Sequence, residues 1–208
     1  MKHFRFILQL AVVIGVTCAH AGPKEDLFRA IEIDAAHLVR SALATGLDPN
    51  VRDEQGQVPL VLALRSSGPE VAEALLTHPR IEIDSANASG ETPLMMAALR
   101  GDLAMVRRLV ERGAKINRDG WTPLHYAASG PSVEVVALLL DRGAAIEAPS
   151  PNGTTPLMMA ARYGAIDAAD LLLRRGADTR ARNQRDMNAA DFAAGAGREA
   201  LAQRLAPR

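Results

Sequence analysis

The side chains that could carry out catalysis or bind a metal are few in this sequence of 208 residues. Beyond residue 21 the histidines are His37, His78 and His125, and neither His37 nor His78 has a second His or a Cys nearby that could share a metal ion. The one cysteine is Cys18. The sequence contains no Gly-rich loop ending in Lys-Ser/Thr, no His-Glu-x-x-His and no Gly-x-Ser-x-Gly. We therefore expect no catalytic residues, no cofactor, no metal site and no enzyme activity.

Two methionine pairs, Met95-Met96 and Met158-Met159, are the other chemically reactive feature. Thioethers can consume oxidants or bind soft metals, which would suggest protection against oxidative stress through methionine oxidation. Methionine also fills irregular gaps between packed helices. We favour packing for these four residues and keep oxidative protection as an alternative function.

The stretch Asp119–Gly143 contains His125 and predicts two short helices. Asp119-Gly120 is a turn dipeptide, Thr122 can cap a helix, and Pro123 suits its first position. A second helix begins after Ser132, is almost wholly apolar, and is followed by Gly143 where a left-handed terminator is expected. Two such helices cannot bury their apolar surface alone, so this unit needs neighbours.

Matching segments supply those neighbours. Pro59, Pro93, Pro123 and Pro156 head them at spacings of 34, 30 and 33 residues, and a turn Gly precedes each Pro by three positions. This self-similarity resembles the ankyrin repeat, and Thr122–Ala127 matches the Thr-Pro-Leu-His-x-Ala core of that family. The resemblance implies an all-α solenoid of stacked helix-turn-helix units with short β-hairpin-like finger loops. It also implies that His125 is a structural clasp, bonded to a turn backbone and a neighbouring Thr.

The register of the repeat predicts the domain organisation. One ankyrin-repeat domain fills residues 22–208, and residues 1–21 precede it. Its parts are an N-terminal cap at 24–51, repeats at 52–84, 85–117, 118–147 and 148–180, and a C-terminal cap at 182–205. Gly120 lies only seven positions after Gly113, whereas Gly153 lies ten positions after Gly143. We therefore expect the finger between the second and third of these repeats to be short and to interrupt the row of fingers. The outer face of the N-terminal cap is expected to be polar because it meets water.

The first 21 residues read as a secretory signal peptide. Lys2 and Arg5 precede the apolar run Phe6–Val16, which is too short to span a membrane, and Ala19-His20-Ala21 suits cleavage after Ala21. Lipid attachment at Cys18 is the less favoured alternative, because no small residue stands directly before it. We expect a periplasmic or secreted protein with no membrane insertion after cleavage.

Charge and cysteine content narrow the class of partner. The 24 basic and 24 acidic residues become 22 and 24 once Lys2 and Arg5 are removed, a net charge of −2. This balance favours neither nucleic acid nor a membrane surface as partner. Losing Cys18 leaves no disulfide in an oxidising compartment, which is ordinary for a bacterial periplasmic protein.

The resemblance implies where a protein partner binds: beside the turn Gly of each finger and at the end of each first helix, on a concave face. Trp, Tyr and Arg carry most of the energy at protein interfaces. The predicted partner-binding residues are Trp121, Tyr163, Arg100, Arg118, Asp119, Arg162, Glu91 and Asn152. A purely structural role remains open for Trp121, which could simply cover the neighbouring finger.

These observations lead to a function of binding rather than catalysis. The leading hypothesis is a monomeric, non-enzymatic scaffold or adaptor in the periplasm that binds a protein through its concave face. An immunity- or inhibitor-type protein that blocks a periplasmic toxin or enzyme is the main alternative. The sequence does not separate the two.

Overall fold

The computed structural model describes residues 22–66 and 68–206. The predicted signal peptide and its cleavage site lie outside the described residues, so both stay predictions. Within the described range the regular secondary structure consists of helices alone, with no strand. The predicted all-α class is therefore confirmed.

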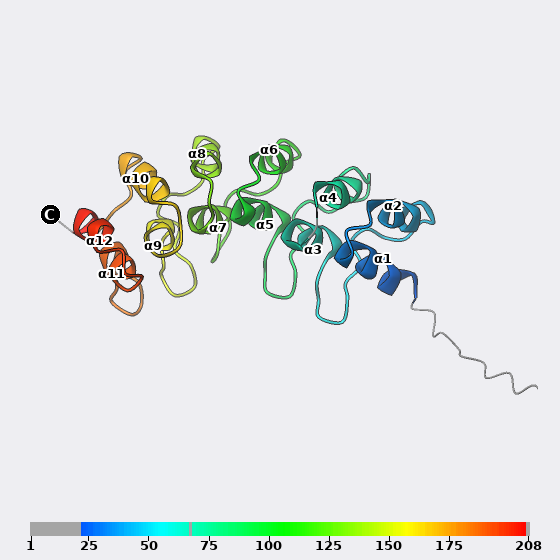
Figure 1. Cartoon of the computed structure of the whole chain (residues 1–208), viewed down its shortest axis with the longest axis horizontal. Coiled ribbons are helices and arrows are strands. Elements are labelled where there is room, and N and C mark those ends of the chain that lie inside the picture. Colours follow the sequence, from blue (N-terminus) through cyan, green and yellow to red (C-terminus); the bar gives the residue numbers. More distant parts are fainter. Residues whose placement is uncertain (1–21, 67, 207–208) are drawn as a thin grey trace, which may run out of the picture.

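The helices form a two-row solenoid (Figure 1). Odd-numbered helices make one row and even-numbered helices the other, and each odd helix packs on the next odd one. The described helices are α1 (Pro23–Glu32), α2 (Ala36–Ala44), α3 (Pro59–Ser66), α4 (Pro69–Leu76), α5 (Pro93–Arg100), α6 (Leu103–Glu111), α7 (Pro123–Ser129), α8 (Val133–Asp141), α9 (Pro156–Arg162), α10 (Ile166–Arg174), α11 (Ala189–Ala194) and α12 (Glu199–Leu205). We call the odd helices the inner row and the even helices the outer row.

The ends of the helices follow from local sequence. Thr92 and Thr155 accept hydrogen bonds from the backbone N–H three residues on, and a proline occupies the first turn after each. The outer helix α8 is followed by Gly143 at φ 86°, a left-handed conformation that costs a residue without Cβ little. In the repeat at 118–147 the N-cap residues are Thr122 and Ser132, and Gly143 follows the second helix, as the sequence predicts.

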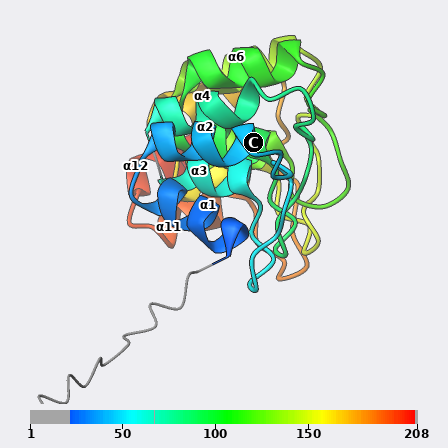
Figure 2. The same cartoon turned by 90° about the vertical axis from the view of Figure 1, so that its right-hand side faces the viewer.

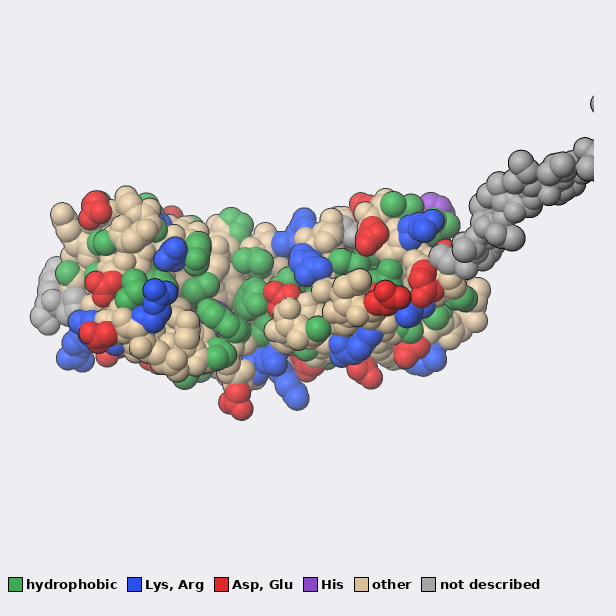
Figure 3. All heavy atoms as spheres, turned by 90° about the horizontal axis from the view of Figure 1, so that it is seen from below, with side chains coloured by type: hydrophobic (Ala, Val, Ile, Leu, Met, Phe, Trp, Pro, Cys, Tyr) green, Lys and Arg blue, Asp and Glu red, His purple; other side chains and the backbone are tan. Residues whose placement is uncertain are grey.

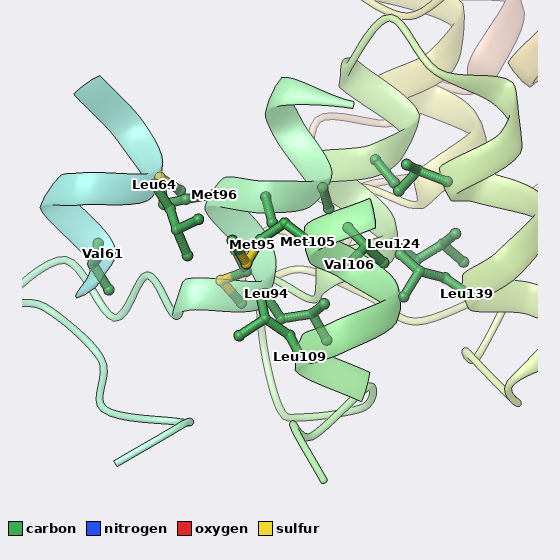
Figure 4. Close-up of a cluster of buried hydrophobic side chains, with 14 of the residues drawn as sticks. Val61, Leu64, Leu94, Met95, Met96, Met105, Val106, Leu109, Leu124 and Leu139 are labelled. Atoms are coloured by element: carbon green, nitrogen blue, oxygen red, sulfur yellow. The ribbon is translucent and has the colours of Figure 1, made fainter. Parts of the chain in front are cut away.

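The core lies between the two rows. Leu94, Met95 and Met96 of α5 are at most 1% exposed. Leu94 and Met95 lie toward Leu109 and Met105 of α6, whereas Met96 lies beside Leu64 of α3 (Figure 4). A continuous cluster of such residues runs from α1 to α12. Each repeat therefore buries the apolar side that its neighbour leaves open, as expected of a solenoid.

Five loops, which we call fingers, join each outer helix to the next inner helix. They project from the inner row to the same side of the molecule (Figures 1 and 2). The fingers are residues 45–58, 77–92, 112–122, 142–155 and 175–188. The third finger is the shortest, which confirms the predicted shortening.

Four fingers are closed by the same device. In the second finger the Asn87 side-chain oxygen accepts the N–H groups of Ser89 and Glu91, and the Asn87 N–H donates to the Glu91 carbonyl at 3.0 Å. Asp53, Ser150 and Asn183 begin the equivalent closures in the first, fourth and fifth fingers. The described backbone hydrogen bonds include no such closure in the third finger.

The outer face of the N-terminal cap differs from expectation. Ile33 is 62% exposed and Leu38 is 44% exposed, and both line a hollow of about 510 Å³ between α1 and α2. Asp26 and Arg29 line it too. The prediction of a polar outer face was therefore only partly right, because the end of α1 and the start of α2 keep apolar side chains toward solvent.

Candidate functional site

Trp121 lies on the third finger, directly before the helix α7. It is half-buried, and its ring meets the His125 ring edge to face with centroids 5.2 Å apart. Arg118, three residues earlier, donates from Nη1 to the Gly90 carbonyl of the second finger at 2.6 Å. These two side chains hold a finger that lacks a backbone closure.

His125 is fully buried and joins two repeats. Its Nδ1 accepts the Thr122 N–H at 3.1 Å and lies 2.9 Å from the Thr122 hydroxyl, so Nε2 carries the proton and donates to the Thr154 carbonyl at 2.9 Å. Burial lowers the pKa of His125 below its ordinary value, despite its contact with the Thr154 carbonyl. The ring is therefore neutral and both nitrogens are occupied, which confirms the structural clasp.

Met95 and Met158 take the place of His125 in α5 and α9. Each sulfur accepts the N–H of the capping threonine, Thr92 or Thr155, at 3.4 Å. Met95, Met96 and Met158 are 1% exposed. Their burial supports packing and gives no support to sacrificial oxidation, which needs a thioether that oxidants can reach.

Two adjoining hollows on the concave face surround Trp121. One of about 250 Å³ lies over α7, between Leu99, Tyr126 and Ser129, and one of about 510 Å³ continues toward the fifth finger. Trp121, Met159 and Tyr163 line both. Seen from the finger side, apolar side chains gather across the middle of this face (Figure 3). We call the two hollows together the Trp121 groove.

The charged residues of the groove are arginines. Arg162 and Arg185 line the larger hollow, and no Asp or Glu lines either one. The Arg162 guanidinium carbon lies 5.2 Å from the centroid of the Tyr163 ring, a cation–π contact, while Tyr163 is 60% exposed. A side chain this large and this exposed is available to a partner.

Tyr126 closes the groove toward the second finger. Its hydroxyl donates to the Glu91 carboxylate at 3.3 Å, and Arg65 lies 3.8 Å from the same carboxylate. Burial, with the negative charge of Glu91, raises the pKa of Tyr126 to about 12. The phenol therefore stays neutral and fixes the end of the groove.

The structure brings half of the predicted partner-binding residues to this groove. Trp121, Tyr163, Arg162 and Asn152 line it. Glu91 and Arg118 contact residues at its edge or on the neighbouring finger. Asp119 is exposed on the third finger.

Arg100 lies elsewhere. Its Nη1 donates to the Arg65 carbonyl at 3.0 Å, and it lines a separate hollow shared with α3 and α4. The end of α5 therefore holds Arg100 against the preceding repeat.

Several groove residues are absent from the predicted set: Tyr126, Met159, Asn183, Arg185, Met187 and Phe192. The last four belong to the C-terminal cap. Asp186 holds φ 57° where the other fingers have glycine, and it lies 33 residues after Gly153. Asp186 therefore takes the turn position of the fifth finger, and Arg185 directly precedes it. The 33-residue spacing of the repeats, applied to the C-terminal cap, would have identified Arg185 as a candidate.

The described residues hold no cluster of three or more His, Cys, Asp or Glu side chains suited to a metal ion. None of the described helices combines the length and the apolar character that a bilayer crossing needs.

Comparison with known proteins settles the family. The model of a family described as ankyrin repeats (3 copies) matches residues 27–119, 66–150 and 116–183, and these overlapping matches cover most of the chain. The chain belongs to the ankyrin-repeat family. Ankyrin repeats are scaffolds whose concave surface binds other proteins, and membership implies this coarse function.

The curated relatives are longer proteins. The chain is 40% identical over 70 residues to the poly [ADP-ribose] polymerase tankyrase of Caenorhabditis elegans, which covers 32% of this chain and 3% of that protein. It is 31% identical over 96 residues to human NF-kappa-B inhibitor alpha, covering 44% of this chain and 30% of that protein. The chain thus spans less than a third of the length of these relatives.

Among the solved structures that match is one that aligns with most of this chain. It is the complex of the Bd0816 predatory endopeptidase from Bdellovibrio bacteriovorus with immunity protein Bd3460. The matched chain superposes with a TM-score of 0.72 at 25% identity, over 87% of this chain and 96% of that one.

Proposed function

We propose that this protein is an exported, immunity- or inhibitor-type ankyrin-repeat protein that binds an endopeptidase through the Trp121 groove. The observation that carries the proposal is the match, over 87% of this chain, to a chain of an endopeptidase–immunity protein complex. Between the adaptor and inhibitor hypotheses, this match favours the inhibitor. The predicted signal peptide supports a periplasmic site of action.

The groove suits this role because it presents large aromatic side chains that neighbouring residues hold in place. Trp121 and Tyr163 offer large apolar surfaces at low entropic cost, and Arg162 and Arg185 flank them. Trp121 is held by His125, and His125 by the next finger, so its ring is positioned before a partner arrives. Binding there would block an enzyme by covering the surface around its active site.

Inhibition assays test the proposal. Exported endopeptidases of the native host are purified, and each is assayed on its own substrate with and without this protein. One of them should lose activity with one-to-one stoichiometry. Trp121→Ala should weaken inhibition by about thirtyfold, since removing a central aromatic anchor costs about 2 kcal/mol or more.

Arg107→Ala is the matched control, because Arg107 is exposed on the outer helix α6. It should inhibit as the unchanged protein does. If no endopeptidase is inhibited, the inhibitor proposal fails and the adaptor hypothesis returns. If Trp121→Ala inhibits fully, the site is wrong.

A further inference from the structure

The Trp121 groove has a chemistry that restricts what it can hold. Its smaller hollow of about 250 Å³ is lined by Leu99, Met159, the three aromatic side chains of Trp121, Tyr126 and Tyr163, and by His125 and Ser129. Both side-chain nitrogens of His125 are already engaged, and the Ser129 hydroxyl donates to the His125 carbonyl at 2.9 Å. The polar groups of His125 and Ser129 are thus already engaged, and the surface of the smaller hollow is almost wholly apolar, so it accepts an apolar group.

The size of the smaller hollow suits a single side chain better than a whole small molecule. Sites for small-molecule ligands usually begin at about 300 Å³ and enclose most of the ligand. The smaller hollow falls short of that value and opens directly into the larger one past Trp121 and Tyr163. This shape suits one large apolar side chain whose own backbone continues along the groove.

The larger hollow adds a demand for negative charge. Its ionisable residues are Arg162 and Arg185, on α9 and on the fifth finger, and its other polar residues are Asn152, Thr154 and Asn183. Asn183 and Thr154 are buried and bonded within their fingers, whereas both arginines are exposed. Guanidinium groups bind carboxylates through paired hydrogen bonds and are less heavily hydrated than an ammonium, so they suit an interface.

We propose that the occupant of the groove is an acidic, apolar segment of the partner protein. This inference rests on the proposed function and specifies the partner's docking element. One large apolar side chain of the segment enters the hollow beneath Trp121 and Tyr163, and an Asp or Glu of the same segment pairs with Arg162 and Arg185. The partner therefore presents a projecting loop or tail, and this protein receives it.

The chain contains its own reporter for this site. Trp121 is the single tryptophan of the sequence, and it lines both hollows. A peptide that lacks tryptophan can therefore be followed by Trp121 emission alone. The probes are peptides selected from a displayed random library on the purified protein.

The expected result has three parts. Enriched peptides combine an Asp or Glu with a large apolar residue, they change Trp121 emission on binding, and their affinity falls with added salt because the charge pair is partly exposed. Arg162→Glu with Arg185→Glu should weaken an enriched peptide by about tenfold or more. The same double variant should bind the peptide whose acid is replaced by Lys better than it binds the original. The charge-matched control is Arg107→Glu with Arg174→Glu, on the outer helices α6 and α10, which should leave binding unchanged.

Four results would overturn the inference: no enrichment, enriched peptides without acids, binding that ignores both charge reversals, or a preference of the groove for a short single-stranded oligonucleotide. The endopeptidase assay separates this inference from the proposed function. If Trp121→Ala relieves inhibition while the double charge reversal does not, the docking element is not acidic and the proposed function stands. If neither change relieves inhibition, the inhibitor acts through another surface, and both the groove assignment and this inference fail.

Discussion

The inner helices and the fingers of the central repeats differ in how closely successive repeats approach. At the inner row, a Cβ added to Gly164 would lie 2.0 Å from the Ala128 carbonyl oxygen, and one added to Gly130 would lie 2.7 Å from that of Leu99. Glycine at both positions lets α7 contact its neighbours on each side almost backbone to backbone. The repeats are thus fixed firmly at their helices.

The tips of the fingers above the same helices are loosely joined. The first and second fingers share a backbone hydrogen bond from Ala88 to Gly56, and the fourth and fifth share one from Gln184 to Asn152. The backbone hydrogen bonds of the described chain include none between the third finger and either neighbour. Side chains make the links instead. On one side Arg118 donates to the Gly90 carbonyl, and the Asp84 carboxylate accepts the Lys115 N–H. On the other side Asn117 donates to the Gly143 carbonyl and accepts the Ala145 N–H, while at the tip the Pro151 ring, which has no N–H to donate, lies against Gly120.

This difference explains where the groove forms. A solenoid held together at its inner helices but interrupted in its row of fingers opens on the concave side at the interruption. Trp121 occupies that opening. Substitutions should therefore cost most stability at the inner helices, less at His125, which joins an inner helix to a finger, and least at the finger tips.

The largest effect is expected from Gly164→Ala. The added methyl group would meet the Ala128 carbonyl, which belongs to a buried helix and cannot move freely. We expect a loss of about 3 kcal/mol in the free energy of unfolding, at the upper end of overpacking costs. Urea denaturation followed by Trp121 fluorescence measures it.

Gly143→Ala provides the control for Gly164→Ala. Gly143 has φ 86° with no atom within 4 Å of an added Cβ, so only backbone strain acts there. The expected loss is about 1 kcal/mol. Equal losses in the two variants would mean that α7 and α9 are not packed as closely as described.

His125→Met should have the next largest effect. Methionine at this position can accept the Thr122 N–H, as Met95 and Met158 do in their repeats, but it cannot donate to the Thr154 carbonyl. We expect a loss of about 1–2 kcal/mol for a buried hydrogen bond left unmade. Met158→Leu, which keeps an apolar side chain in the same slot, should cost less, and the reverse order in urea denaturation would contradict the clasp.

The dependence of the unfolding free energy on pH should also reflect the burial of His125. Burial lowers the folded-state pKa of His125 below the ordinary 6.5, so the unfolded chain binds a proton that the folded chain does not. Stability should therefore fall as the pH drops below about 6.5, by at most about 1.4 kcal/mol per pH unit from this group. Denaturation at pH 7.5 and 5.5 measures the slope, and His125→Met should flatten it. An unchanged slope would mean that burial does not lower the pKa of His125 in the fold.

The smallest effect is expected from Pro151→Ala in the loose region. It introduces an N–H beside Gly120, at the finger position where Ala88 donates to Gly56. The change in unfolding free energy should stay within about 0.5 kcal/mol, as for most surface substitutions. Hydrogen exchange at the new amide reports whether the third and fourth fingers have joined. Rapid exchange equal to that of the exposed Pro149→Ala control would show that they stay apart.

The fold and the shortened third finger were predictable because short sequence motifs determine the backbone of each repeat. The Thr-Pro-Leu segments, the turn glycines and the short Gly113–Gly120 interval each specify backbone geometry directly. The His125 clasp was implied by the resemblance of Thr122–Ala127 to the ankyrin repeat. The site was predicted only in part, because a groove depends on which side chains from separate repeats converge.

Two residues illustrate the limit. Arg100 occupies a first-helix end like Arg162, yet it donates to the Arg65 carbonyl, and only the packed neighbour reveals that. Phe192 reaches the groove from a cap where the repeat motif has decayed. Sequence periodicity gives the position of a residue in its repeat, whereas the contacts between repeats decide which surface it joins.

The central claim is that a partner binds in the groove at Trp121, and fluorine NMR tests it most directly. Labelling this chain with 5-fluorotryptophan gives one resonance, because the sequence has one tryptophan. On titration with the inhibited endopeptidase, that resonance should shift and saturate at one equivalent. Inhibition of the enzyme with an unmoved resonance would place the partner on another surface and contradict the account.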